Sequence, residues 1–138
     1  MGKNADRVAI AGEKLIDRAM RRLVIRLYQG LTSASPVDTG FFRGRWVPIL
    51  GRADRSFTID RPADRVVAKA TGARLFAKHQ ALALAFSKSY RANQGPLSIV
   101  NSTSYAIFLD QGTSSQAPAQ FVERETRRAV RATQRELG

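Results

Sequence analysis

The feature that most constrains the fold is a long helical pattern near the start of the chain. Over residues 6–29, apolar side chains recur at spacings of three and four, which places them on one face of an α-helix. The members of this stripe are Leu15, Ile16, Ala19, Met20, Leu23 and Leu27. Most arginine and lysine side chains lie off the stripe. We therefore expect a core-packing helix with a basic outer face that stops at Gly30, with the break confirmed by Ser35-Pro36.

The rest of the chain alternates between strand-like and helical patterns. The expected elements are a loop over 31–45, strands at 46–50 and 56–60 joined by a loose hairpin at 51–55, a helix over 66–90, a strand at 97–101 and a helix over 119–137 opened by Pro118. Gly72 weakens the first turn of the middle helix, so its firm part is expected from Ala73. Pro48 indicates a sheet edge or a bulge. This order predicts an α+β fold in one domain, residues 1–138, with a small antiparallel sheet packed with N-terminal, middle and C-terminal helices.

The charge balance points to a polyanionic or acidic partner. The chain carries 23 basic residues against 11 acidic ones, a net charge of +12, and 18 of the basic residues are arginine. Arginine favours planar contacts with phosphate and carboxylate groups. The alternative is a solvated basic surface that only keeps the protein soluble. There is no run of eighteen apolar residues and no signal-peptide pattern, so we expect a protein of the cytosol or of an assembly built there.

Catalytic signals are nearly absent from the sequence. With no cysteine and one histidine, thiolate chemistry and histidine-cluster metal sites are excluded. His79 falls on the apolar face of a helix and is expected to be packed and hydrogen-bonded. A magnesium-dependent nuclease built from Asp38, Asp60 and Asp110 is the remaining enzyme hypothesis, although the sequence does not say whether these carboxylates meet. We expect no enzymatic activity, no cofactor and no bound metal.

Two stretches are more distinctive than the rest. The first runs from Val37 to Trp46, where Asp38 can accept from nearby backbone N–H groups and Gly40 can supply a positive φ. The second runs from Asn101 to Pro118, where Gly112 is expected to adopt a conformation that a β-carbon would resist and Asp110 to hold the turn. The residues of interest are Asp38, Thr39, Gly40, Arg43, Arg45, Trp46, Asn101, Tyr105, Ala106, Asp110, Gly112, Ser114, Gln116 and Pro118.

In this order, separated by a helix, these stretches resemble the tail-completion (neck, minor tail protein Z-like) proteins of lambda-like long-tailed bacteriophages. The family pattern is Asp-Thr-Gly, a basic stretch and Trp, then Asn before Tyr-Ala, an acidic residue, Gly, Ser and Gln-Ala-Pro before a C-terminal helix. The layout covers almost the whole chain, and the motifs cover about thirty residues. Two positions depart from the pattern, because Asp110 replaces the usual Glu and Phe41-Phe42 replaces smaller or basic residues. The phenylalanine pair is a candidate partner surface.

The resemblance implies a structural virion protein, made in the host cytoplasm, in the neck that joins the tail to the DNA-filled head. It would form a ring around the DNA channel, expected to be a hexamer, and contact a tail terminator or tail tube protein and a head-completion or connector protein. The motif residues would then lie at a junction between subunits. The candidate basic residues for the channel or a partner are Arg18, Arg21, Arg22, Arg124, Arg127, Arg128 and Arg131. The alternative is a free-standing basic nucleic-acid-binding domain.

Overall fold

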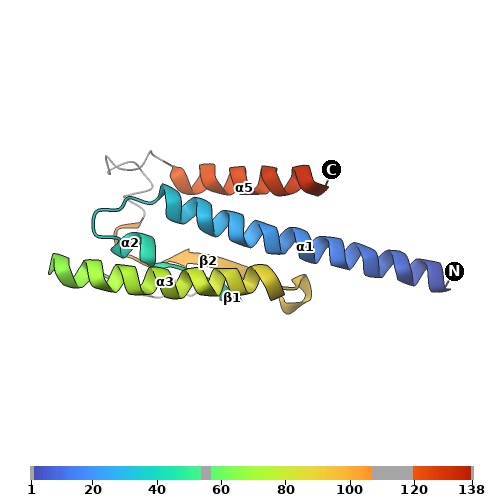
Figure 1. Cartoon of the computed structure of the whole chain (residues 1–138), viewed down its shortest axis with the longest axis horizontal. Coiled ribbons are helices and arrows are strands. Elements are labelled where there is room, and N and C mark those ends of the chain that lie inside the picture. Colours follow the sequence, from blue (N-terminus) through green and yellow to red (C-terminus); the bar gives the residue numbers. More distant parts are fainter. Residues whose placement is uncertain (1, 54–56, 107–119, 138) are drawn as a thin grey trace.

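The computed structural model describes residues 2–53, 57–106 and 120–137, and it confirms the α+β class. Its elements are α1 (Gly2–Ala34), α2 (Phe41–Gly44), β1 (Trp46–Leu50), α3 (Arg65–Ser89), the 3₁₀ helix η1 (Ala92–Gln94), β2 (Leu97–Asn101) and α5 (Phe121–Leu137), as labelled in Figure 1. Among the described helices, none is long and apolar enough to cross a bilayer.

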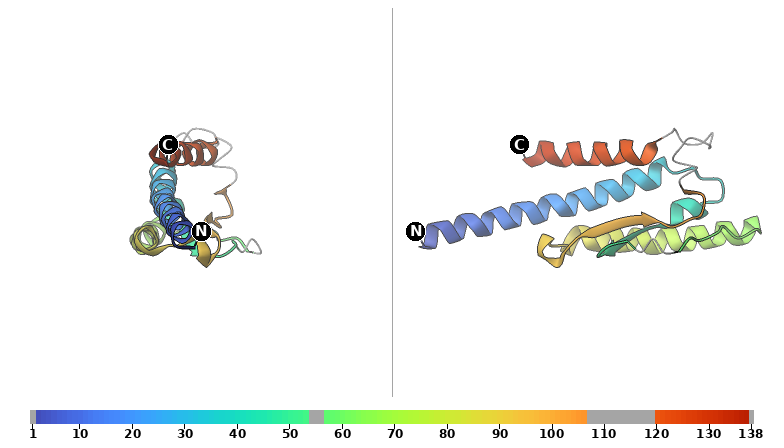
Figure 2. Two further views of the ribbon diagram at one scale, coloured as in Figure 1. Left: turned by 90° about the vertical axis from the view of Figure 1, so that its right-hand side faces the viewer. Right: turned by 180° about the vertical axis from the view of Figure 1, so that it is seen from behind.

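Helix α1 lies between the two other long helices, with α5 along one side, α3 along the other and the two strands beside them (Figure 2). One core joins the three helices to the sheet. It is formed by the buried residues Tyr28, Leu31, Phe42, Trp46, Ala83 and Phe121. Aromatic rings dominate this core, so burial of large apolar surfaces provides most of its stabilisation.

The sheet has two antiparallel strands, with Trp46 opposite Asn101 and Leu50 opposite Leu97. The predicted hairpin partner at 56–60 is wrong, because the partner of β1 is β2. Part of that segment lies outside the described residues, and Ile59 forms only an isolated parallel bridge with Thr103. Contacts between residues far apart in the chain determine which strands pair, and a local alternation pattern carries no information about those contacts. With one strand neighbour in the described sheet, β1 is an edge strand, as Pro48 indicated.

Helix α1 is longer than predicted, because Gly30 does not end it. The helix continues to Ala34, and the short helix α2 lies where a loop was expected over 31–45. At Gly30 the side chain of Glu125 on α5 approaches so closely that an added Cβ would lie 2.9 Å from Glu125 Oε2. Gly30 is therefore a contact position between two helices. The helix ends at Ala34, four residues beyond the predicted stop and directly before Ser35-Pro36.

Helix α3 begins earlier than predicted, at Arg65 and not near Ala73. The side chain of Asp64 accepts hydrogen bonds from the backbone N–H groups of Val66 and Val67, which is an N-cap. Gly72 lies inside the helix, and any larger residue there would clash, because an added Cβ would lie 2.5 Å from the backbone of Gly40. The glycine permits close approach of α2 and does not weaken the helix start.

Helix α5 matches its prediction from Phe121 onward, while Pro118 and Ala119 lie outside the described residues. The spacing of apolar residues in this helix places Phe121, Ala129 and Leu137 on its inward side. Phe121 and Ala129 are buried, but Leu137 is 49% exposed. Its place near the end of the helix, beside Leu15 of α1, leaves it covered on one side only.

Candidate functional site

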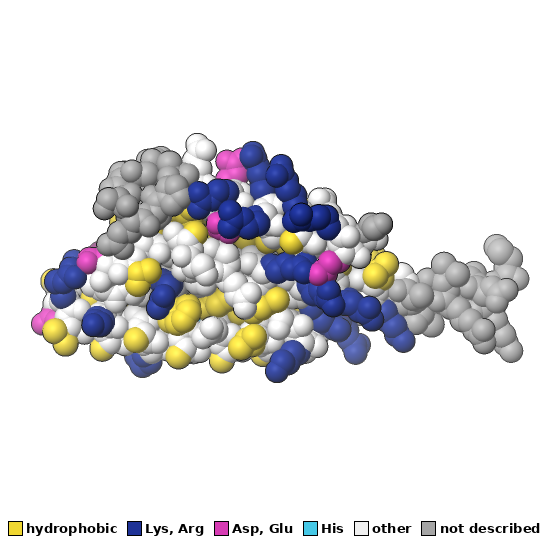
Figure 3. All heavy atoms as spheres, turned by 45° about the horizontal axis from the view of Figure 1, so that its top comes forward, with side chains coloured by type: hydrophobic (Ala, Val, Ile, Leu, Met, Phe, Trp, Pro, Cys, Tyr) yellow, Lys and Arg dark blue, Asp and Glu magenta, His cyan; other side chains and the backbone are white. Residues whose placement is uncertain are grey.

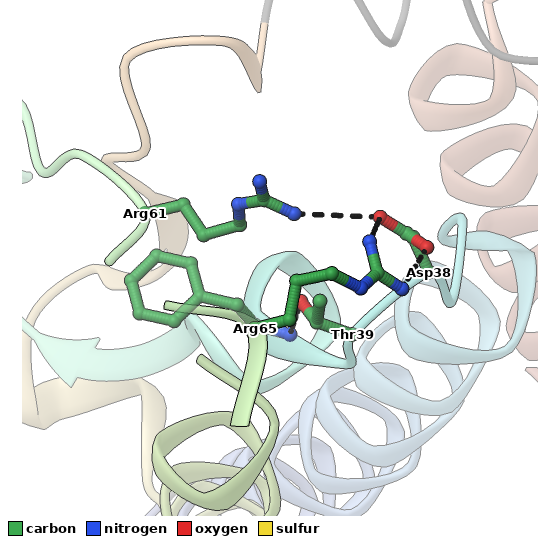
Figure 4. Close-up of polar contacts among 5 residues, drawn as sticks. Asp38, Thr39, Arg61 and Arg65 are labelled. Carbon is green, nitrogen blue, oxygen red and sulfur yellow. Dashed lines mark hydrogen bonds and ion pairs between the residues drawn. The ribbon is translucent and has the colours of Figure 1, made fainter. Parts of the chain in front are cut away.

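The structure brings the first distinctive stretch against the start of α3 (Figure 4). Asp38 accepts two hydrogen bonds from the Arg65 guanidinium, at 2.9 and 3.0 Å, and a longer one from Arg61 at 3.4 Å. Asp38 was expected to accept from backbone N–H groups, but its hydrogen-bond partners within the described ranges are these two arginine side chains. The hydroxyl of the next residue, Thr39, accepts from the N–H of Phe41. The hydrogen bonds from Arg65 and the charges of both arginines hold the pKa of Asp38 below its usual value. Asp38 is therefore a stable anion that ties the α1–α2 connection to α3.

Gly40 has φ = 83°, which confirms the predicted positive φ. It precedes α2, whose two phenylalanines are both buried. Phe42 packs against Trp46, Tyr105 and Phe121, with ring centroids 5.8–6.3 Å apart. The hypothesis that Phe41-Phe42 is a partner surface is therefore wrong, because both rings are part of the interior.

The basic stretch between the phenylalanines and the strand is held by stacking. The Arg43 guanidinium lies 4.4 Å from the centroid of the Phe76 ring, and that of Arg45 lies 5.1 Å from the Phe41 ring. The Nε atoms of both arginines are buried without a hydrogen-bond partner. Cation–π contacts of this kind fix the guanidinium planes. Arg43 and Arg45 therefore act mainly within the protein, where their guanidinium groups pack on the rings of Phe76 and Phe41.

The second distinctive stretch meets the first across the sheet. Asn101 lies opposite Trp46, and its amide Nδ2 donates to the carbonyl of Phe42 at 2.9 Å. The other amide atom, Oδ1, accepts from the N–H and the hydroxyl of Thr103. Tyr105 packs on Phe42, and Ala106 packs against the same core. The described motif residues from the two halves of the chain thus lie together. We call this set the motif joint; its members are Asp38, Thr39, Gly40, Arg43, Arg45, Trp46, Asn101, Tyr105 and Ala106. Asp110, Gly112, Ser114, Gln116 and Pro118 lie outside the described residues.

A second group of predicted residues lies on the outer face of α5. Basic side chains, all of them arginines on this helix, gather along it in Figure 3. An open groove of about 870 Å³ on this face is lined by eight residues, five of them arginines. We call this surface the arginine face; its arginines are Arg124, Arg127, Arg128, Arg131 and Arg135. Arg124, Arg128, Arg131 and Arg135 are spaced by four, three and four residues, so they form one row along the helix.

The arginines of this face differ in how far their charge is neutralised. Arg124 and Arg128 both contact Glu125, at 3.5 and 3.3 Å, and the side chain of Glu125 is only 6% exposed. Arg127 pairs with Glu123 one turn earlier. Arg131 and Arg135 make no ion pair or hydrogen bond in the part of the chain that the structure describes. These two cations are therefore the most available to an external anion.

The predicted basic residues of α1 have separate roles. Arg21 donates from Nε to the carbonyl of Tyr90 at 2.7 Å and so holds the end of α3. Arg22 and Arg26 both pair with Glu136 of α5, and hydrogen bonds from Arg26 and Arg22 lower the pKa of Glu136. Arg18 is exposed and has no ion-pair partner among the described residues. Of the three α1 candidates, Arg18 alone has neither an ion pair nor a hydrogen bond among the described residues.

Sequence reasoning missed three arginines that matter here. Arg61 and Arg65 partner Asp38, and Arg135 continues the row on α5. The row was visible in the spacing of the C-terminal helix, where Arg135 follows Arg131 by four residues. The partners of Asp38 carry no such signal, because their contact spans more than twenty residues of chain.

Within the described ranges, no group of three histidine, aspartate or glutamate side chains could hold a metal ion. Asp38 and Asp60 therefore belong to no such group, and Asp110 lies outside those ranges. Comparison with known proteins finds no matching family model, no matching curated protein and no matching solved structure.

Proposed function

We propose that this chain is a structural protein of the neck of a long-tailed bacteriophage, where it completes the tail and joins it to the DNA-filled head. In this proposal several copies form a ring, and genomic DNA passes through the channel of that ring. The chain carries out no catalysis there. Its neighbours are a tail terminator or tail tube protein on one side and a head-completion or connector protein on the other.

The single observation that carries the DNA contact is the arginine face of α5. It presents five arginines on one helix side, and two of them, Arg131 and Arg135, are free of intramolecular partners in the described part of the chain. A row of cations binds the phosphates of the DNA backbone, and phosphate contacts carry no sequence information. The proposal assigns no helix to the major groove and no aromatic side chains to base stacking. Phosphate contacts hold any duplex in the same way whatever its sequence, which is what passage of a whole genome through a ring calls for.

The motif joint supports the family part of the proposal. The motif residues that the structure describes link α1, α2, α3 and the sheet. A subunit that packs into a ring needs its helices and sheet held in one fixed arrangement, and these residues hold them so. The family assignment itself depends on the sequence resemblance.

The alternative is a free-standing nucleic-acid-binding domain, and the same arginine face favours it. The two functions differ in affinity and selectivity. A dedicated domain binds a specific site at about 10⁻⁸ M or tighter at physiological salt, whereas a channel contact is weak in the single subunit and indifferent to sequence.

The experiment that tests the neck function uses the phage that encodes the chain. We expect phage lacking this protein to build filled heads and finished tails that stay separate in electron micrographs. Adding the purified chain to that lysate should restore joined particles and infectivity. Normal joined particles from the phage that lacks the protein would contradict the proposal.

A further inference from the structure

Helix α5 carries a buried carboxylate. Of the three acidic side chains of this helix, only that of Glu125 is buried, and it belongs to the inward row Phe121, Glu125, Ala129 and Thr133. The carboxylate lies against α1, since an added Cβ at Gly30 would lie 2.9 Å from Glu125 Oε2. A carboxylate so far removed from water requires a compensating cation or hydrogen-bond donor close by.

The arginine face supplies that compensation. Arg124 Nε and Arg128 Nη1 lie 3.5 and 3.3 Å from Glu125 Oε1. Within the described ranges, no other cation or hydrogen-bond donor contacts this carboxylate. The side chains of the two arginines are 44% and 68% exposed, so each arginine contacts a buried anion on one side and water on the other.

Arg124 and Arg128 lie on the border of two open grooves. They line the groove of the arginine face, and together with Glu125 they also line a groove of about 530 Å³ between α1 and α5. A phosphate in the first groove therefore competes with Glu125 for the same two guanidinium groups. The competition is effective because Glu125 is buried, and a buried charge is screened by water and salt much less than an exposed one.

The other arginines of this face meet no buried competitor in the described part of the chain. The carboxylate of Glu123, which pairs with Arg127, is exposed, and exposed pairs contribute little. Arg131 and Arg135 are exposed and make no ion pair among the described residues. The row on α5 is therefore graded, because its first two arginines share one buried anion and its last two have none.

We propose that Glu125 limits how tightly the arginine face holds DNA. The inference rests on the DNA contact of the proposed function and names the residue that weakens that contact. Because Glu125 contributes one negative charge, Arg124 and Arg128 together present one unit of positive charge to a duplex and not two. A phosphate that draws either arginine away also leaves the buried carboxylate less compensated, which opposes binding. The contact therefore stays weak enough for a duplex to move past it.

Glu125→Gln tests this directly, because it removes the charge and keeps the size of the side chain. The purified variant and the natural chain are each titrated with a DNA duplex at several salt concentrations. We expect the affinity of the variant to be about 5- to 10-fold higher at 0.1 M salt, and the magnitude of its salt slope to be larger by about 1, because one more cation is available to a phosphate. A purely structural role for Glu125 predicts no such gain, since looser packing of α5 on α1 adds no phosphate contact.

The matched control is Asp60→Asn, which changes the net charge by the same amount. Asp60 is exposed and makes no ion pair within the described ranges, so its replacement releases no arginine and should leave the slope unchanged. Circular dichroism establishes that each variant is folded. If the amide is not accommodated, Glu125→Met removes the same charge with a side chain of similar size.

Two results would overturn the inference while the DNA contact stands. One is a folded Glu125 variant whose slope equals that of the natural chain, and the other is an equal rise in Asp60→Asn. A natural chain that binds no duplex at any salt concentration would remove the proposed DNA contact and this inference together, so the two failures are distinguishable.

Discussion

At the scale of single residues, the absence of a side chain determines how closely α2 approaches α3. A Cβ at Gly72 would lie 2.5 Å from the backbone of Gly40, and one at Gly44 would lie 2.4 Å from the carbonyl oxygen of Gly72. The same contact is held by His79, whose Nδ1 lies 2.8 Å from the carbonyl oxygen of Gly44. These residues bring the Asp38 segment against α3.

The substitution Gly72→Ala should therefore destabilise the protein even though alanine favours helices. We expect the free energy of unfolding to fall by at least about 1–3 kcal/mol, because backbone atoms must move to admit the methyl group. Gly12→Ala is the matched control: it lies in α1 with no atom within 4 Å of an added Cβ. There the change should raise stability by about 0.5–1 kcal/mol. Urea unfolding of both variants measures the two signs, and equal effects would contradict this account of Gly72.

His79 should make stability depend on pH. Burial lowers the pKa of His79 below its usual 6.5 despite its hydrogen bond to Gly44. The unfolded chain therefore binds the proton more readily, so this contribution to stability is present above pH 6.5 and is lost as the pH falls toward the folded pKa. We expect the free energy of unfolding to drop between pH 7 and pH 5, by at most about 1.4 kcal/mol per pH unit from this group, and the urea midpoint to fall with it. In His79→Gln the drop over this range should be smaller, and an identical pH profile would argue against the assignment.

At the scale of elements, sequence periodicity predicted the three long helices and both strands of the sheet, but it predicted neither the short helix α2 nor which strands pair. The apolar stripes of α1 and α5 depend only on residues three and four positions apart, so the sequence alone reveals them. The pairing of β1 with β2, the continuation of α1 through Gly30 and the start of α3 at Arg65 depend on contacts between residues far apart in the chain. The motif joint was partly predictable, since its residues were singled out, but the partners of Asp38 were not.

One hydrogen bond links the end of α1 to β1. The indole N–H of Trp46 donates to the hydroxyl of Ser35 at 2.8 Å, and that hydroxyl donates to the carbonyl of Leu31, all in the interior. Ser35→Ala leaves the buried indole N–H unpaired, so we expect a loss of about 1–3 kcal/mol in the free energy of unfolding. Exposed Ser33→Ala should change it by less than about 0.5 kcal/mol. Fluorescence of the single tryptophan follows both transitions, and equal midpoints would refute the role of this bond.

At the scale of the whole molecule, exposed cations and exposed apolar side chains are spread over several elements. Basic side chains that are exposed and make no ion pair within the described ranges include Arg18 of α1, Arg74 of α3 and Arg131 of α5. On α5, however, five arginines share one side of the helix. This concentration of charge is why the account assigns the DNA contact to the arginine face.

The most direct measurement of the central claim is the affinity of the purified chain for two unrelated DNA duplexes over a range of salt concentrations. We predict weak and equal binding to both, with the logarithm of the binding constant falling linearly with the logarithm of salt concentration. Arg131→Gln with Arg135→Gln should reduce the magnitude of that slope by about 2, because two phosphate contacts are lost. The double change Arg74→Gln with Lys78→Gln on α3 should leave the slope unchanged. Tight, sequence-selective binding by the monomer, or a slope that the α5 variant does not change, would contradict the account.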